Sequence, residues 1–321
     1  MIETAARSAL EASDSGALLK LTNRLCKAQS WNELTELRQL CAEAVSRGKQ
    51  LWAVAEHIRY RLILEGPPHM VGAMLAGPEP RFGLGPLPEV AASRLGWDDL
   101  ADHLPPGPVA TAVAMERAAR GEDLSRLQLD IAELPAKLQP WEPTYPMATY
   151  HPNRVEAPSP SIPATRPVAV DAYPISLDDP ESLLSLENVV LAWTTESNGR
   201  SATVAAEGPV TAALALIGAP SIEVGTIEPR EALAWLGWAG ASGGAHGRRR
   251  GAAAGRAAAW WVVANLCDLP EPLEAAAVGE AADGLTWYWW TDLSPDTGWF
   301  LRIAAEDPKE GISWAIGAAD A

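Results

Sequence analysis

In the first 120 residues, apolar side chains recur every three or four positions, which is the spacing of one face of an α-helix. The clearest stripe follows a capping-box pattern at Ser30–Glu33 and stops before Gly48. Its members are Trp31, Leu34, Leu37, Cys41 and Val45. The spacing predicts helices at 16–29, 31–47, 50–64, 69–76, 87–95 and 108–120. Because the connections between them are short, we expect helix hairpins packed side by side.

Prolines dominate the middle of the chain, with ten of them between residues 140 and 180. Proline lacks a backbone N–H and fits neither a helix interior nor a central strand. The same segment contains the aromatic residues Trp141, Tyr145, Tyr150 and Tyr173, which a freely flexible linker would lack. The sequence therefore predicts a helical domain at 1–139, a Pro-rich linker at 140–180 that packs on a domain surface, and a second domain at 181–321.

Beyond residue 180, helical patterns alternate with short β-like segments. Helices are predicted at 181–193, from about 209, at 228–240 and at 252–266. Strands are predicted at 201–206, 221–227, 285–291, 299–304 and 312–318, and turn residues at 294–298 and 307–311 divide the last three as in hairpins. The predicted fold class is α+β, in which helix hairpins precede a Trp-rich C-terminal domain with a small antiparallel sheet.

Composition narrows the class of protein. Hydrophobic residues make up 48% and charged residues 21% of the 321 positions, as in ordinary folded domains. The net charge of −16 disfavours nucleic acid and anionic membranes as partners, because both bind basic surfaces. The sequence has no apolar run long enough for a membrane span, and Glu3 and Arg7 argue against a secretory signal. We therefore expect a cytoplasmic protein.

The glycine- and arginine-rich segment 240–256 concentrates the unusual residues and would form a loop that enters a helix. Amides at a helix N-terminus, together with guanidinium groups, can bind a phosphate or a carboxylate. The candidate ligand-binding residues are Ser242, His246, Arg248, Arg249, Arg250, Gly251 and Arg256. A structural interpretation stays open, in which the glycines let two helices pack closely and the arginines pair with acidic neighbours.

Two motifs in this segment are typical of enzymes. Gly240–Gly244 fits the G-x-S-x-G nucleophile elbow, but a serine hydrolase needs an acid and then a histidine well downstream, and only His246 follows Ser242. Arg248–Ala253 resembles the R/Q-x-x-G-x-G/A pyrophosphate loop of the GNAT acetyltransferase family, which implies a CoA or nucleotide pyrophosphate there. An acyl- or nucleotide-dependent transferase is therefore the alternative function, with its cofactor unknown. A strand before Gly247 would favour the transferase, and a helix there would favour a binding or structural role.

Metal and thiol chemistry are not indicated. The five histidines are scattered, and no H-E-x-x-H pattern occurs. Cys26, Cys41 and Cys267 lack C-x-x-C spacing, so we expect neither a disulfide framework nor a zinc site. Small core residues are the expected role of these cysteines.

Tryptophan is strongly over-represented, with 14 residues against two phenylalanines. Trp287–Trp290, with Trp299 and Trp314, would line the predicted sheet, where alternate residues face opposite sides. A core between sheet and helices explains these rings. A ligand groove or a protein interface is the alternative, because large exposed apolar patches usually mark binding.

Three segments together resemble an uncharacterised protein family of high-GC actinobacteria: the Gly/Arg segment, the helix Glu56–Leu62 and the closing segment Gly298–Ala321. The resemblance would span most of the chain. It implies an actinobacterial lineage, but no activity or mechanism, because none is established for that family. The leading hypothesis is a binding or interaction protein. Its C-terminal domain would recognise an anionic small molecule or an acidic peptide at Arg248–Arg256, and its helical half would contact a protein partner.

Overall fold

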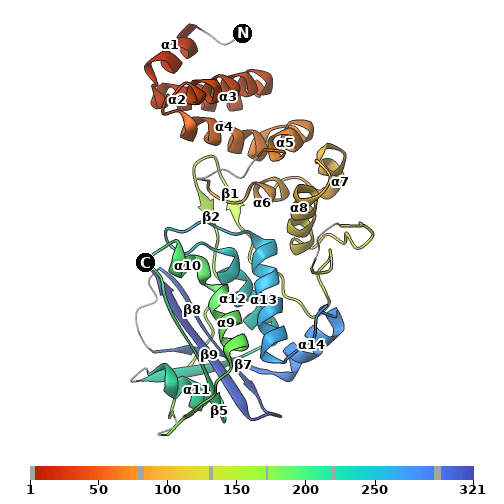
Figure 1. Cartoon of the computed structure of the whole chain (residues 1–321), viewed down its shortest axis with the longest axis vertical. Helices are drawn as coiled ribbons and strands as arrows, with labels where there is room; N and C mark the ends of the chain where they lie inside the picture. The colour runs from red at the N-terminus through yellow and green to blue at the C-terminus, as the bar shows by residue number, and fades with distance from the viewer. Residues whose placement is uncertain (1–3, 78–82, 130–132, 171–172, 219–220, 293–297) are drawn as a thin grey trace. The chain divides into compact units, whose positions relative to one another are not determined.

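The computed structural model describes residues 4–77, 83–129, 133–170, 173–218, 221–292 and 298–321 (Figure 1). The chain forms two compact units. The helical unit comprises Met1–Arg117, Leu129–Ile131 and Thr149–Glu156, and the C-terminal unit comprises Ala118–Gln128, Ala132–Ala148 and Ala157–Ala321. The chain therefore passes from one unit to the other more than once. The domain boundaries at 139 and 180 stay a prediction from sequence.

Short helices fill the first 120 residues, as their apolar stripes predict. They are α1 (Thr4–Ala12), α2 (Ser15–Lys27), α3 (Trp31–Ser46), α4 (Trp52–Glu65), α5 (Pro68–Leu75), α6 (Leu87–Ala92), α7 (Trp97–Leu100), the 3-10 turn Ala101–His103 and α8 (Pro108–Ala119). A small hairpin of β1 (Thr149–Tyr150) and β2 (Val155–Glu156) completes the helical unit. Among the described residues, no helix is long and apolar enough to cross a membrane.

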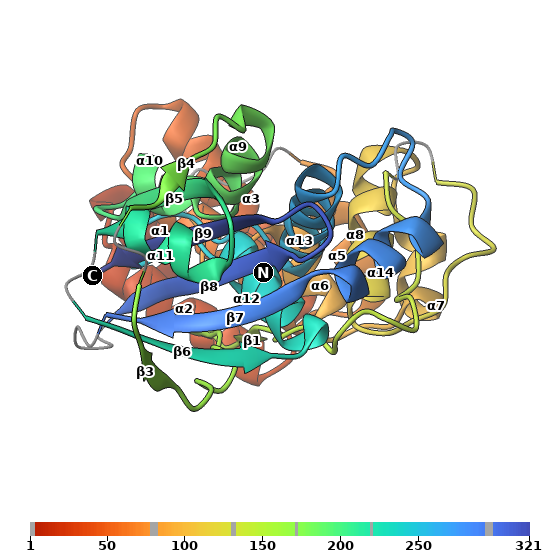
Figure 2. The ribbon, with the colours of Figure 1, turned by 90° about the horizontal axis from the view of Figure 1, so that it is seen from below.

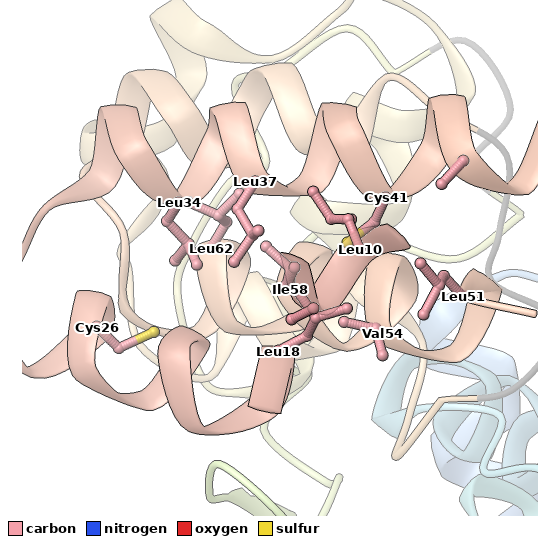
Figure 3. Packing of buried hydrophobic residues seen from close by; sticks show 12 residues of the cluster. Leu10, Leu18, Cys26, Leu34, Leu37, Cys41, Leu51, Val54, Ile58 and Leu62 are labelled. Atoms are coloured by element: carbon pink, nitrogen blue, oxygen red, sulfur yellow. The ribbon is translucent and has the colours of Figure 1, made fainter. Parts of the chain in front are cut away.

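The core of the helical unit is built from the apolar stripes of α1 to α4 (Figure 3). Leu34 and Leu37 of α3 and Ile58 of α4 are completely buried in it. Burying one such side chain contributes roughly 1.5–3 kcal/mol to folding. Cys26 and Cys41 also lie in this core, so their predicted role as small buried residues is confirmed.

A seven-stranded antiparallel sheet organises the C-terminal unit, in the order β3-β6-β7-β8-β9-β5-β4. Its strands are β3 (Arg166–Val168), β4 (Ile175–Ser176), β5 (Arg200–Glu207), β6 (Ile222–Ile227), β7 (Thr286–Thr291), β8 (Trp299–Asp307) and β9 (Ile312–Asp320). The helices are α9 (Pro180–Val189), α10 (Leu191–Thr195), α11 (Val210–Ile217), α12 (Pro229–Ala241), α13 (Ala252–Leu266) and α14 (Ala275–Gly284). The predicted α+β class is confirmed.

Both faces of this sheet are covered, but by different helices. α9, α12 and α13 lie on one side of the strands, and α11 lies on the other (Figure 2). Alternation along β7 follows this division. Trp289 packs against Trp235 of α12, with ring centroids 4.3 Å apart, whereas the next residue, Trp290, belongs to the cluster under α11.

The tryptophans of the sheet form a core and not an exposed patch. Trp287, Trp289, Trp290 and Trp314 are each no more than 3% exposed. Trp238 of α12 stacks on Trp299 of β8, with centroids 4.9 Å apart. Burial of these large rings between sheet and helices therefore accounts for the bias in composition.

The edges of the sheet come from the Pro-rich segment, which sequence alone describes only as unsuited to a central strand. β3 pairs with β6 at one edge, and β4 pairs with β5 at the other. Pro167 lies within β3, where the missing N–H is tolerated because an edge strand needs only one ladder of hydrogen bonds. Together with the five strands predicted from sequence, these two edge strands make a sheet of seven.

Candidate functional site

The Gly/Arg segment connects two helices, because α12 ends at Ala241 and α13 begins at Ala252. Gly251 precedes α13 with a φ of +100°, a conformation that favours glycine. Gly243 allows a close approach of backbone to backbone, since a Cβ there would lie 2.3 Å from the carbonyl oxygen of Gly247. The loop is therefore a compact turn between helices.

The loop backbone is held by acceptors of the protein itself. The amide of Ala245 donates to Asp320 Oδ2 at 2.6 Å, and that of Arg248 donates to Glu196 Oε2 at 3.1 Å. The amides of Arg250 and Gly251 both donate to the carbonyl of Ala241. Ala252 and Ala253, at the start of α13, are also engaged in interactions. The amides of Ala245, Arg248, Arg250 and Gly251, which a phosphate cradle could use, thus already have partners in the protein.

Ser242 is buried and makes a hydrogen bond within the protein, whereas a catalytic serine would be exposed to its substrate. It is 1% exposed, and its Oγ accepts a hydrogen bond of 2.7 Å from the indole Nε1 of Trp193. It follows α12, whereas a nucleophile elbow follows a strand. His246 is exposed, and its backbone amide donates to Ser197 Oγ at 3.1 Å. The two residues therefore do not form a serine–histidine arrangement at this loop.

The four arginines of the segment lie in different environments. Arg250 is exposed, and its Nη1 lies 3.4 Å from the carbonyl oxygen of Asn188 on α9. Arg248 is half-buried and Arg249 is buried, and both are engaged in interactions. Arg256 is 0% exposed. The structure therefore separates Arg256 from the loop arginines with which the sequence groups it.

Arg256 binds Glu142 inside the C-terminal unit. Its Nε donates to Glu142 Oε2 and its Nη2 to Oε1, both at 2.7 Å, in the bidentate geometry of a strong pair. The guanidinium also donates to the carbonyls of Pro135 and Lys137. These bonds hold residues 135–142, which include the start of the Pro-rich region, against α13, so Arg256 has a structural role.

Glu142 accepts further hydrogen bonds at the same place. Trp260 Nε1 and the Tyr145 hydroxyl donate to its Oε2 at 2.9 and 3.0 Å, and the amide of Gln139 donates to Oε1 at 2.8 Å. Burial, followed by the nearby Glu142 carboxylate, raises the pKa of Tyr145 well above its ordinary value, which keeps the hydroxyl a donor. The sequence does not indicate this cluster, because its partners are more than 100 residues apart.

A groove of about 570 Å³ lies between α9, α13 and the end of the Gly/Arg loop. On α9 it is lined by one face of the helix, with Leu184 and Asn188 exposed there. On α13 it is lined by Ala254, Ala257, Ala258, Trp261 and Asn265, which recur at helical spacing. Arg250 is the basic residue of its lining, and Glu133 and Glu181 are the acidic ones.

This groove combines an apolar wall with one cation. The alanines leave room above α13, and the Trp261 ring and Leu184 supply apolar surface. Arg250 lies just before the N-terminus of α13, where the helix dipole also favours a negative group. Of the sequence-predicted residues, Arg250 alone lines this groove, and the residues of α9 that complete it were not indicated by sequence.

Among the described residues, no group of three or more His, Cys, Asp or Glu side chains could hold a metal ion. The loop with the pyrophosphate-like pattern follows the helix α12, whereas the GNAT pattern follows a strand. Helix–loop–helix geometry is the arrangement expected for a binding or structural role.

The chain was compared with curated proteins, solved structures and protein-family models. Neither the curated proteins nor the solved structures contain a significant match to the chain. The model of a family of unknown function, DUF6183, matches residues 16–308, which include the helices of the helical unit from α2 onward and most of the sheet. The chain therefore belongs to the family of unknown function DUF6183.

Proposed function

We propose that the protein is a binding protein whose groove between α9 and α13 takes a small molecule with one anionic group on an apolar body. The observation that carries this proposal is the position of the exposed Arg250 at the end of a largely apolar groove of about 570 Å³. That volume lies in the range of ordinary small-molecule sites.

The charges around the groove favour a single negative group. Arg250 can make charge-assisted hydrogen bonds to a carboxylate or a phosphate. Glu133 and Glu181 also line the groove and would repel a polyanion such as a nucleoside triphosphate or a CoA pyrophosphate. The helix before the loop and the engaged backbone amides also favour a binding role over the transferase alternative.

Titration calorimetry with decanoate tests this proposal, with decanol as the uncharged control. Replacing Arg250 by alanine removes a charge-assisted interaction worth about 1.5–3 kcal/mol, so decanoate should bind about 10- to 100-fold more weakly. Arg248→Ala is the matched control, because Arg248 lies in the same loop but does not line the groove. Decanoate should bind this variant as it binds the wild type.

Two results would contradict the proposal. One is that decanoate does not bind at millimolar concentration, and the other is that it binds Arg250→Ala and the wild type equally well. Inorganic phosphate serves as a further probe. If phosphate alone binds and decanoate does not, the apolar wall of the groove has no part in recognition.

The expectations on location, lineage and partner remain inferences. We infer a cytoplasmic location partly from the free thiols of Cys26, Cys41 and Cys267, because reduced cysteines are usual in that compartment. The actinobacterial lineage and a protein partner for the helical half rest on sequence alone. Fractionation of cells that express the tagged full-length protein tests the location.

A further inference from the structure

The helix Glu56–Leu62, one of the segments singled out by sequence, has a defined set of contacts in the helical unit. Arg59 holds the end of α5, because its Nε and Nη2 donate to the carbonyls of Met74 and Gly77 at 2.8 and 2.9 Å. Tyr60 donates to the carbonyl of His151 at 2.5 Å. These contacts engage Arg59 and Tyr60, whereas His57 and Arg61, one helical turn apart, share another face of α4.

His57 and Arg61 line a pocket of about 450 Å³ inside the helical unit. α2 contributes Ser15 and Asn23, which lie two helical turns apart on one face. The turn between β1 and β2 contributes Asn153. Three elements thus bring a hydroxyl, two amides, an imidazole and a guanidinium to one place.

The turn that closes this pocket is fixed from several sides. Tyr60 binds the His151 carbonyl, and the amide of His151 donates to the carbonyl of Arg154 at 2.9 Å. The Tyr150 hydroxyl donates to Glu89 Oε2 at 2.5 Å, and Glu89 is completely buried. The turn that carries Pro152 and Asn153 is therefore held in place, as the wall of a preformed binding site would be.

We propose that this pocket binds a small, flat, uncharged heterocycle with hydrogen-bond donors and acceptors on its edges, such as a nucleobase or nucleoside. The polar lining offers both donors and acceptors, since asparagine amides and a neutral imidazole each present one of either kind. Apolar walls formed by Leu19, Val54 and Pro152 would contact the faces of a flat ring.

The charges at the pocket oppose an ionic ligand. Arg61 is 6% exposed at its side chain, and Glu65 neutralises it through two hydrogen bonds of 2.9 and 3.1 Å. Arg61 Nη1 also donates to Asn23 Oδ1. Burial, and then the charge of Arg61, lower the pKa of His57, which favours the neutral imidazole near pH 7. A polar molecule without net charge therefore suits the site.

Equilibrium dialysis of adenosine, guanosine, cytidine and uridine against the full-length protein tests this proposal, with ribose as the control that lacks a base. At least one nucleoside should bind, and ribose should not. Asn153→Ala removes an exposed amide of the pocket and should weaken binding about three- to tenfold, the value of one hydrogen bond. Arg154→Ala is the matched control. Arg154 is the next residue along the chain, but its side chain pairs with Glu156 and does not line the pocket.

A second variant blocks the pocket without touching the core. Ala53 is exposed and lines the pocket, so Ala53→Trp should abolish nucleoside binding while circular dichroism and the unfolding temperature stay as in the wild type. Binding that persists in Ala53→Trp, equal binding of ribose, or no binding of any nucleoside at millimolar concentration would each overturn the proposal.

Discussion

At the scale of single residues, Glu142 has the most demanding environment in the C-terminal unit. Its carboxylate is shared by Arg256, Trp260 and Tyr145, and both it and Arg256 have completely buried side chains. A buried charge is tolerated only when it is paired and hydrogen-bonded. The pair itself adds little to the free energy of unfolding. Loss of either partner, however, would leave the other charge buried and unpaired, which is strongly destabilising.

Arg256→Met should strongly destabilise the protein, because it leaves the Glu142 carboxylate buried without its cation. The expected loss in the free energy of unfolding is about 3–5 kcal/mol, measured by urea denaturation. Arg250→Met is the control and should change stability by less than about 0.5 kcal/mol, since Arg250 is exposed. The double variant Arg256→Met/Glu142→Gln should recover part of the loss. Equal midpoints for the two single variants would rule out the buried pair.

The cysteines should react slowly in the native protein. Burial raises the pKa of Cys26, Cys41 and Cys267 to about 11, so only about one thiol in a thousand is a thiolate at pH 8. Iodoacetamide should label the native chain slowly at pH 8, with a rate that rises about tenfold per pH unit, and should label all three thiols quickly in denaturant. Intact mass spectrometry measures the number of labelled thiols over time. Rapid labelling of the native protein at pH 7 would contradict this expectation.

At the scale of elements, local patterns predicted most of what the structure contains. The apolar stripes located α2 to α6, and the hairpin-like segments located β7, β8 and β9. α14 was missed because its alanine-rich sequence, Ala275–Gly284, carries no distinct stripe. α3 begins at Trp31, as the capping-box pattern at Ser30 predicts. The Ser30 side chain, however, makes no capping hydrogen bond, so the capping box is not fully formed.

The candidate site was less predictable than the elements, for a physical reason. Sequence indicated that arginines and glycines concentrate before α13, and Arg250 does line the groove. Which arginine is exposed depends on partners far along the chain, such as Glu142 for Arg256. The other wall of the groove depends on α9 packing beside α13, a tertiary contact that no local pattern encodes.

Glycines set the distance between α12 and α13. A Cβ on Gly255 would lie 2.0 Å from the carbonyl oxygen of Gly237 and 2.9 Å from the Cβ of Ala241. Gly255→Ala should therefore destabilise the protein by about 1–3 kcal/mol, although alanine is the better helix former by about 1 kcal/mol. Gly284→Ala, with nothing within 4 Å of the added atom, should be neutral or stabilising. The unfolding temperatures of the two variants and the wild type test this prediction. A Gly255→Ala variant as stable as the wild type would show that α12 and α13 can move apart without cost.

At the scale of the whole C-terminal unit, one Pro-rich segment supplies both edges of the sheet. Only six residues lie between Val168 of β3 and Ile175 of β4, so the seven Cα–Cα steps from one to the other can span at most about 25 Å. The two edges of a flat seven-stranded sheet would be about 29 Å apart. The sheet must therefore twist or curve enough that the end of β3 and the start of β4 lie within about 25 Å of each other.

This arrangement bears on aggregation. An open strand edge presents unpaired amides and carbonyls to which another chain can add, and natural proteins protect such edges with short strands and prolines. β3 and β4 have three and two residues, and β3 contains Pro167, which cannot donate a backbone hydrogen bond to an added strand. Since a single segment protects both edges, any cleavage or substitution that released it would expose β5 and β6 together, and the C-terminal unit would gain two sites for intermolecular β-pairing at once.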